Sequence, residues 1–157
     1  AGKRVVACSR KSEAASLLRL LGAADVLSPS DVVDPAPKSL ATGRWAGVID
    51  TVGGSLLADI LRSVRIGGAV AAVGMAGGAD LVTTVHPFIL RGVTLAGIDI
   101  AVQPSQDDRR ILWARLGAMW PTLAGRLPVT RLRLDDVGDY ARRMLAGETV
   151  GRGVVIL

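Results

Sequence analysis

The sequence predicts an α/β fold built on a doubly wound parallel sheet, and three observations support this. Short apolar runs alternate with helical periodicity along the first hundred residues, which is typical of strands joined by crossover helices. Glycine is abundant, with 19 residues, and suits the tight turns that such a fold needs. Apolar residues make up 50% of the chain and charged residues 21%, which is typical of a globular domain.

The chain opens on a predicted strand, Lys3–Cys8 (KRVVAC). We expect Cys8, inside this apolar run, to be a buried and unreactive thiol. A helix follows over Ser12–Leu21, because apolar residues recur there at i, i+3, i+4 and i+7. Ser12 is its predicted N-cap and Gly22 its C′ residue.

The middle of the chain repeats this alternation of strand and helix. We expect strands over Trp45–Thr51 and Ala69–Val73; the second is entirely apolar, as in parallel strands covered on both faces. Between them, Ser55–Val64 is a predicted helix that the pair Gly67-Gly68 ends. Further extended segments are expected at Asp25–Leu27, Val82–Val85 and Val93–Ile98, and a loop over most of Ser28–Gly43.

The last fifty residues have longer helical segments. Ser105 and Asp108 form a capping-box-like start for a helix that we expect to reach about Trp120 and to stop at Pro121. Three elements are then predicted: a half-exposed strand at Thr130–Leu134, a helix over Val137–Leu145 capped by Asp135 or Asp136 and stopped by Gly147, and a closing strand at Val154–Leu157.

Composition excludes several classes of function. The net charge is +5, but the basic residues form no run and only 3% of residues are aromatic, so we expect no nucleic-acid binding. One His and one Cys give no metal-ligand spacing, and we expect no metal. No apolar stretch is long enough to span a membrane and no signal-peptide pattern opens the chain, so a cytoplasmic location is expected.

Small or polar residues follow three of the predicted strands. These strand ends are Ser9–Lys11, Asp50–Gly53 and Gly74–Gly78. Ligands of open α/β sheets bind beyond the carboxyl ends of the strands, and glycine lets a ligand approach the backbone closely. The agreement of three strand ends indicates a cofactor site, although each of the two glycine turns alone is also compatible with an ordinary connection.

A hydroxyl and two bases, Ser9-Arg10-Lys11, follow the first predicted strand. In dinucleotide-binding folds, an acid at the tip of the second strand holds the ribose 2′-hydroxyl of NAD, and a base accommodates the 2′-phosphate of NADP. We therefore read Lys3–Cys8 as the second strand of a Rossmann-like, NADP-binding sheet. The alternative is a polar turn with solvated bases. No G-x-G-x-x-G fingerprint lies between a predicted strand and a predicted helix. The partial match Gly151-Arg152-Gly153 leads into the last apolar run, so no helix N-terminus follows it to hold a pyrophosphate.

No arrangement of catalytic residues is found. His86 precedes Pro87 in a stretch that we expect to be a loop, and a lone His is more often structural than catalytic. Asp99, at the end of a predicted strand, is interpreted as a turn residue.

Three segments carry a resemblance to a known family: Trp45–Gly54 (WAGVIDTVGG), Gly67–Gly78 (GGAVAAVGMAGG) and Thr83–Asp99 (TTVHPFILRGVTLAGID). With them, nearly the whole chain resembles the zinc-independent quinone oxidoreductases of the medium-chain dehydrogenase/reductase superfamily, and within it the acrylyl-CoA reductase branch. Pro87–Gly92 (PFILRG) is the most specific part. The resemblance implies a homodimer of two-domain subunits in which a Rossmann domain binds NADPH beside a GroES-like domain. It also implies hydride transfer to the C=C bond of an α,β-unsaturated acyl-CoA, a quinone or an enone, without metal.

The same resemblance implies which residues bind the cofactor. In the family, a Ser-Gly-Arg sequence holds the 2′-phosphate; here Ser9 is kept, Arg10 replaces the glycine and Lys11 replaces the arginine. His86 stands where a Met is more usual, which argues against a shared catalytic role. Further cofactor contacts are expected from the two glycine turns and from a loop near the nicotinamide, at Thr51, Val52, Gly53, Gly74, Met75, Ala76, Phe88, Ile89 and Leu90.

The resemblance also divides the chain. Residues 1–126 correspond to a partial NADP-binding Rossmann domain, and residues 127–157 to a segment that returns toward the GroES-like domain. The first β–α unit and the GroES-like domain have no counterpart in the sequence. In strand order 3-2-1-4-5-6 the first strand is central, and each buried backbone group left unpaired costs about 1–3 kcal/mol. We therefore expect the chain to belong to a longer subunit or to be completed by another chain.

A competing hypothesis is a non-enzymatic, truncated Rossmann-like module that serves dimerisation. In the family, the last Rossmann strand pairs with its copy, and Val93–Ile98 is the matching segment. An open strand edge invites such pairing. A methyltransferase is a more distant alternative, since its glycine-rich loop would also precede the first residue.

Overall fold

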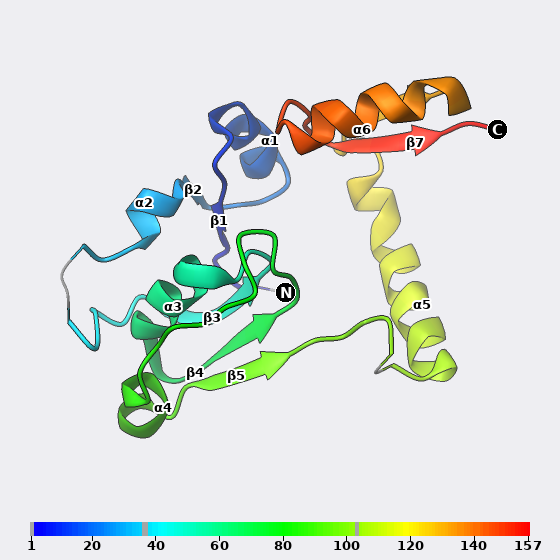
Figure 1. Cartoon of the computed structure of the whole chain (residues 1–157). Helices are drawn as coiled ribbons and strands as arrows, with labels where there is room; N and C mark the ends of the chain where they lie inside the picture. The colour runs from blue at the N-terminus through cyan, green and yellow to red at the C-terminus, as the bar shows by residue number, and fades with distance from the viewer. Residues whose placement is uncertain (1, 36–37, 103) are drawn as a thin grey trace. The chain divides into compact units, whose positions relative to one another are not determined.

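The computed structural model describes residues 2–35, 38–102 and 104–157, which divide into two compact units. The first unit combines the chain up to residue 26 with residues 110–157, and the second is the continuous stretch 27–109. Strands and helices alternate along the chain (Figure 1), which confirms the predicted α/β class.

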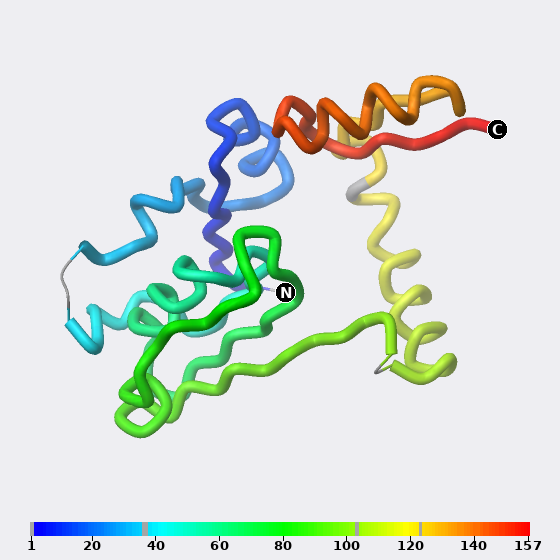
Figure 2. Tube along the Cα trace, in the orientation of Figure 1, coloured from blue at the N-terminus to red at the C-terminus, as the bar shows by residue number. Residues whose placement is uncertain are grey.

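The second unit is built on a parallel sheet. Its strands lie in the order β3-β4-β5 (Figure 1). Figure 2 traces this unit from light blue through cyan and green to yellow-green. Its elements are α2 (Pro29–Val32), β3 (Trp45–Asp50), α3 (Gly54–Arg62), β4 (Val64–Ala72), α4 (His86–Arg91) and β5 (Thr94–Gly97).

Strand β4 begins earlier than the sequence predicted. The expected helix stop at Gly67-Gly68 was wrong: α3 ends at Arg62, and both glycines lie inside β4. Gly67 has φ +69°, and the β3–β4 register shifts between Trp45 and Gly47. A Cβ on Gly68 would lie 2.9 Å from the carbonyl oxygen of Ala46. The glycine pair therefore forms a bulge in the strand, where the two backbones approach closely.

The core of the second unit lies between the sheet and α3, which runs along one face of the sheet (Figure 1). Leu61, Val64 and Val70 are completely buried there. In β4, Ala69 is exposed while the adjacent Val70 is completely buried, so the expectation that both faces of this strand are covered was wrong for this unit by itself. In β3, Ile49 is 79% exposed. Strand β3 thus has one buried and one open face.

Two short helices occur where loops were expected. Helix α2 interrupts the predicted loop, and Ser28 and Asp31 form its capping box: the Ser28 N–H and Oγ–H both donate to Asp31 Oδ2, at 2.9 and 2.6 Å. These bonds from Ser28, with a weaker contribution from the Arg44 charge, lower the pKa of Asp31. Helix α4 begins at His86, and Pro87 in its first turn pre-sets helical φ.

Helix α4 is fixed at its end by Arg91. The guanidinium donates to the carbonyl oxygens of Arg62 at 2.9 Å, Val64 at 2.8 Å and Ala41. Gly92 follows in the left-handed conformation, with φ +58°. The helix is therefore held at the start of β4.

The first unit contains two short sheets. Strand β1 pairs with β2, and β6 pairs with β7 in parallel. Its elements are β1 (Val6–Cys8), η1 (Ser12–Ala14), α1 (Ala15–Leu20), most of β2 (Asp25–Leu27), most of α5 (Gln106–Leu123), β6 (Val129–Leu132), η2 (Leu134–Asp136), α6 (Val137–Leu145) and β7 (Arg152–Val155).

Helix α5 starts as predicted but runs past its expected stop. The Ser105 hydroxyl and N–H both donate to Asp108 Oδ2, and the Asp108 N–H donates back to Ser105 Oγ at 3.1 Å. Pro121 lies inside the helix. It removes one donor from the last turn, but the Ala124 N–H still bonds to the Trp120 carbonyl at 2.8 Å, so the turn closes without it.

Two further findings concern the thiol of Cys8 and the helices of the described part. Cys8 is exposed, so its predicted burial was wrong; three-residue β1 is too short to enclose its last side chain. None of the helices in the described part has the length and apolar character needed to cross a membrane.

Candidate cofactor-binding site

The turn after β3 is organised by a buried carboxylate. Asp50, the last residue of β3, is only 3% exposed. Its Oδ2 accepts the Gly53 N–H at 2.8 Å, and its Oδ1 accepts the Val52 N–H at 3.3 Å. A side chain that accepts backbone N–H groups two and three residues later fixes a tight turn. Asp50 therefore holds Thr51–Gly53 in one shape without projecting from it.

Gly53 takes a backbone conformation that other residues avoid. Its φ is +69° and its ψ is −158°, a region that is essentially restricted to glycine. A Cβ on Gly53 would also collide with the carbonyl oxygen of Gly78. The group that approaches Gly53 closely in this structure is the next turn of the chain, whereas the prediction concerned a ligand.

The turn after β4 is hydrogen-bonded to the turn after β3. The Gly77 N–H donates to the Val52 carbonyl at 2.7 Å and the Ala76 N–H to the Thr51 carbonyl at 3.3 Å. Gly53 and Gly78 form a parallel bridge. A Cβ on Gly74 would lie 2.8 Å from the Thr51 oxygen. Glycine at these positions therefore lets the two turns interlock.

The interlocked turns present an open surface at the carboxyl edge of the sheet. The side chains of Thr51, Met75 and Ala76 are exposed, so this predicted part of the site is accessible to a ligand. Six predicted residues are therefore brought together here: Thr51, Val52, Gly53, Gly74, Met75 and Ala76.

A third strand end lies at the same edge, and the sequence reasoning missed it. β5 pairs in parallel with β4 up to Ala72↔Gly97, and the Ile98 N–H donates to the Ala72 carbonyl at 2.9 Å. Asp99 Oδ1 then accepts the Ala101 N–H at 2.8 Å, which bears out its interpretation as a turn residue. The strand-end rule that selected the other turns would have found Ile98 and Asp99 too.

The remaining residues predicted in this unit lie elsewhere. Phe88 packs partly buried against the core, while Ile89 and Leu90 are 74% and 61% exposed on α4. Arg91, the next residue, bonds to Val64 at the start of β4, whereas the turns follow the ends of β3 and β4. α4 lies beside the starts of β4 and β5 (Figure 1). The structure therefore does not bring Phe88–Leu90 to the turns.

Ser9, Arg10 and Lys11 belong to the first unit, directly after β1. Ser9 Oγ accepts the Lys11 N–H at 3.1 Å. Lys11 Nζ donates to the Thr149 carbonyl at 2.5 Å. The Arg10 side chain is exposed. Two of the three side chains are thus engaged with backbone, and Arg10 projects from the strand end.

Among the described residues, neither His86 nor Asp50 is available as a general acid or base at the interlocked turns. His86 is exposed at the start of α4, with Nδ1 3.0 Å from Thr84 Oγ1. Asp50 is occupied by the N–H groups of its own turn. What this arrangement can do chemically is to present a fixed backbone surface against which a ligand is positioned.

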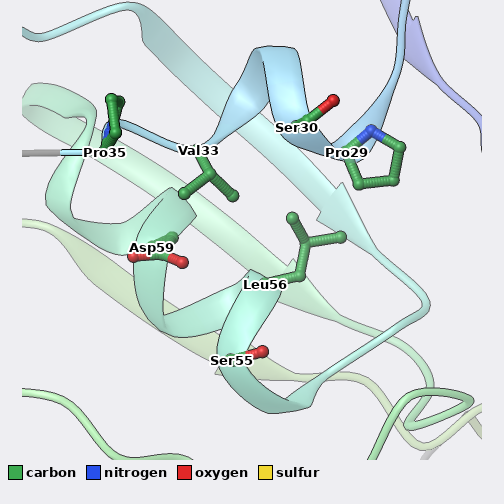
Figure 3. Close-up of a pocket in the computed structure, with 7 residues that line it drawn as sticks. All are labelled: Pro29, Ser30, Val33, Pro35, Ser55, Leu56 and Asp59. Atoms are coloured by element: carbon green, nitrogen blue, oxygen red, sulfur yellow. The ribbon is translucent and has the colours of Figure 1, made fainter.

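A cavity of about 390 Å³ lies in the helical layer of the second unit (Figure 3). Leu56, Ser55 and Asp59 line it from α3, and Asp59 pairs with Arg62 at 2.7 Å. Pro29, Ser30, Val33 and Pro35 complete the lining. Among the described residues that line the cavity, none is a predicted cofactor residue and the one acid, Asp59, is already paired, so we do not place the cofactor there.

Comparison with known proteins identifies the family. Residues 1–116 match the model of the family described as zinc-binding dehydrogenase. The chain belongs to the zinc-binding dehydrogenase family. It is 44% identical over 157 residues to the putative quinone oxidoreductase YhfP of Bacillus subtilis, covering 99% of this chain and 47% of that protein. It is 38% identical to the acrylyl-CoA reductase AcuI of Ruegeria pomeroyi, covering 98% of this chain and 46% of that protein.

Solved structures of the family agree with the fold. YhdH of Escherichia coli K-12, with bound NADPH, matches with a TM-score of 0.88 and 37% identity, over 98% of this chain and 47% of its own. YhfP of Bacillus subtilis, with NAD bound, matches with a TM-score of 0.89 and 38% identity, over 99% of this chain and 47% of its own. The chain thus spans about half the length of the curated relatives that it matches.

The family's name raises the question of zinc. Within the part of the chain that the structure describes, no three His, Cys, Asp or Glu side chains gather where they could hold a metal ion. The described residues therefore do not fit a zinc site, and no step of the chemistry is assigned to zinc here.

Proposed function

We propose that this chain is the NADPH-binding portion of an oxidoreductase that reduces the C=C bond of an α,β-unsaturated acyl-CoA, or a quinone or enone. The observation that carries the proposal is the pair of interlocked turns at the carboxyl ends of β3 and β4, which is where ligands of open α/β sheets bind. The substrate class is that of relatives named quinone oxidoreductase and acrylyl-CoA reductase.

The residues present fit a dinucleotide. Thr51, Met75 and Ala76 are exposed on turns whose backbone is fixed, and Arg10 is an exposed cation after β1 suited to a phosphate. In the proposed role, the interlocked turns and the neighbouring Ile98 and Asp99 orient the nicotinamide end, and the β1 end receives the adenosine 2′-phosphate. NADPH supplies the hydride when it is bound, and no residue of this chain is assigned as an acid or base.

The proposal extends to the division of the chain. Residues 1–126 are taken as the cofactor-binding part, and residues 127–157, which include the parallel pair β6-β7, as a segment that returns toward a catalytic domain. A GroES-like domain in the complete natural protein would then cover the bound cofactor from the other side.

Nucleotide binding tests this function. In the complete natural protein, we expect calorimetric titration to show NADPH binding, and Ala76→Trp on the exposed turn to weaken it at least about tenfold by steric exclusion. Ala46→Trp, at an exposed position near the start of β3, is the matched control and should leave the Kd unchanged. Wild-type protein that binds no NADPH, or an Ala76→Trp variant that binds it normally, would contradict the proposal.

A second candidate function, a dimerisation module without cofactor, is favoured by β5. Among the described residues β5 pairs only with β4 and lies at the edge of the sheet. We infer that a second copy adds its own Thr94–Gly97 to this edge, as in a homodimer. Sedimentation showing a dimer that binds no nucleotide would favour this candidate, and nucleotide binding would exclude it as the whole function.

A further inference from the structure

The three polar residues after β1 are not equivalent. Ser9 and Lys11 are half-buried, whereas Arg10 between them is exposed. The polar groups of Ser9 and Lys11 point into the first unit: Ser9 Oγ accepts the Lys11 N–H at 3.1 Å, and Lys11 Nζ reaches the Thr149 carbonyl at 2.5 Å. No hydrogen bond or ion pair engages the Arg10 guanidinium in the described ranges.

Thr149 belongs to a loop, Gly147–Gly151, whose shape is fixed by its backbone. Gly147 and Gly151 have positive φ values, +80° and +95°, and the Glu148 N–H donates to the Arg143 carbonyl at 2.9 Å. Thr149 is half-buried. Moving the Lys11 ammonium away from this carbonyl would therefore leave a half-buried acceptor without the donor that it has, at a cost in stability.

We propose that Arg10, and not Lys11, recognises the 2′-phosphate of NADPH in this chain, while Lys11 ties Gly147–Gly151 to the end of β1. This inference rests on the proposed function. An ammonium has three donors, but its position is set by the carbonyl that it already holds. A guanidinium is a planar fork that suits a phosphate and is always charged, and the Arg10 fork is exposed.

The consequence is a division of labour within two adjacent bases. Arg10 discriminates NADPH from NADH, because only NADPH carries the 2′-phosphate. Lys11 is a positioning residue: it connects the cofactor-facing strand end to the loop between α6 and β7, 138 residues away in the sequence. Losing either cation removes one charge, but only the loss of Arg10 removes the phosphate ligand.

The test compares matched variants in the complete natural protein. Arg10→Met and Lys11→Met each remove one cation and keep an apolar stem. The control for net charge is Arg4→Met, because Arg4 is an exposed cation that lies two residues before the start of β1. The Kd values for NADPH and NADH are measured by calorimetric titration, and amide hydrogen exchange is followed over residues 147–151.

We expect Arg10→Met to weaken NADPH binding about ten- to a hundredfold and to leave NADH binding within about twofold, as expected for a screened, non-contacting charge. Lys11→Met should change the ratio of the two Kd values by less than about threefold and should accelerate exchange in residues 147–151. Arg4→Met should change neither. NADH binding shows that each variant is folded, and Lys11→Gln, which keeps a donor for Thr149, should restore slow exchange.

A selective loss of NADPH binding in Lys11→Met as large as that in Arg10→Met would overturn the inference and leave the proposed function standing. An Arg10→Met variant that keeps its preference for NADPH would overturn it as well. Wild-type protein that binds neither nucleotide would overturn the proposed function itself, and with it this assignment.

Discussion

The strand ends of the two units make a candidate binding surface in different ways. After β3 and β4, the surface is made by backbone: glycines allow the turns to interlock, and Asp50 is consumed in shaping its own turn. After β1, the surface is made by side chains, and only one of three polar groups projects outward. The difference teaches that the shape of the turns after β3 and β4 and the charge after β1 depend on different residues. Each can therefore be altered without the other.

The largest expected effect breaks the shape-based region. Gly53→Ala places a Cβ against the Gly78 carbonyl and forces a conformation that alanine avoids. We expect a loss of about 3–5 kcal/mol in the free energy of unfolding from strain and overlap, measured by chemical denaturation. Gly97→Ala, where nothing lies within 4 Å of the added atom, should change it by less than about 0.5 kcal/mol. Equal values for the two variants would show that the turns are not interlocked.

The next effect concerns the carboxylate that shapes the turn. Asp50→Asn keeps the size of the side chain but turns an N–H donor toward a backbone N–H that Asp50 now satisfies. We expect a loss of about 2 kcal/mol and faster exchange of the Val52 and Gly53 amides. Asp80→Asn, an exposed acid of the same unit, is the control. Unchanged exchange at both amides would rule out the anchoring role of Asp50.

A smaller effect sharpens the contrast at the end of β1. Lys11→Met removes the bond to Thr149 and should lower the free energy of unfolding by about 1 kcal/mol, because the charge-assisted bond is partly exposed to water. Arg10→Met should have no measurable effect on stability, since Arg10 is exposed and makes no such bond within the described chain. Thermal denaturation of the two variants measures the difference, and an equal Tm for both contradicts it.

The smallest effect is a pH dependence at α2. Bonds from Ser28 lower the pKa of Asp31 from its usual 3.8, so the folded state binds this proton less readily than the unfolded state does. The contribution is therefore present above the unfolded pKa and is lost as the pH falls below 3.8 through the folded value. Asp31→Asn should flatten the stability curve in this range, as measured by urea denaturation between about pH 2 and about pH 5, a range that extends roughly two units below and one unit above the reference pKa. An unchanged curve would contradict the capping box.

Periodicity in the sequence was enough to predict the parallel sheet and α3. β3, β5 and the carboxyl end of β4 lie within one or two residues of their predicted bounds, because short apolar runs between glycine turns have few alternatives. The errors lie at glycine and proline. Gly67 was interpreted as a helix stop, but its positive φ serves a bulge; Pro121 was interpreted as a stop, but it costs only one bond in a last turn.

The candidate site was predictable as a set of strand ends but not as a set of contacts. Glycine at Gly53 and Gly74 indicated close approach, yet the sequence could not show that the approaching group is the other turn. Two bases after β1 indicated a phosphate, yet the partner of Lys11 lies 138 residues away. The local sequence pattern predicts the backbone conformation of each turn. Only the tertiary fold determines which polar groups remain available to bind a ligand.

Hydrogen–deuterium exchange of the complete natural protein, with and without NADPH, tests the central claim most directly. The account predicts slower exchange on adding NADPH in peptides that cover residues 9–11, 50–54 and 74–78, with no change around the cavity of α2 and α3. Protection confined to that cavity, with these strand ends unaffected by NADPH, would contradict it.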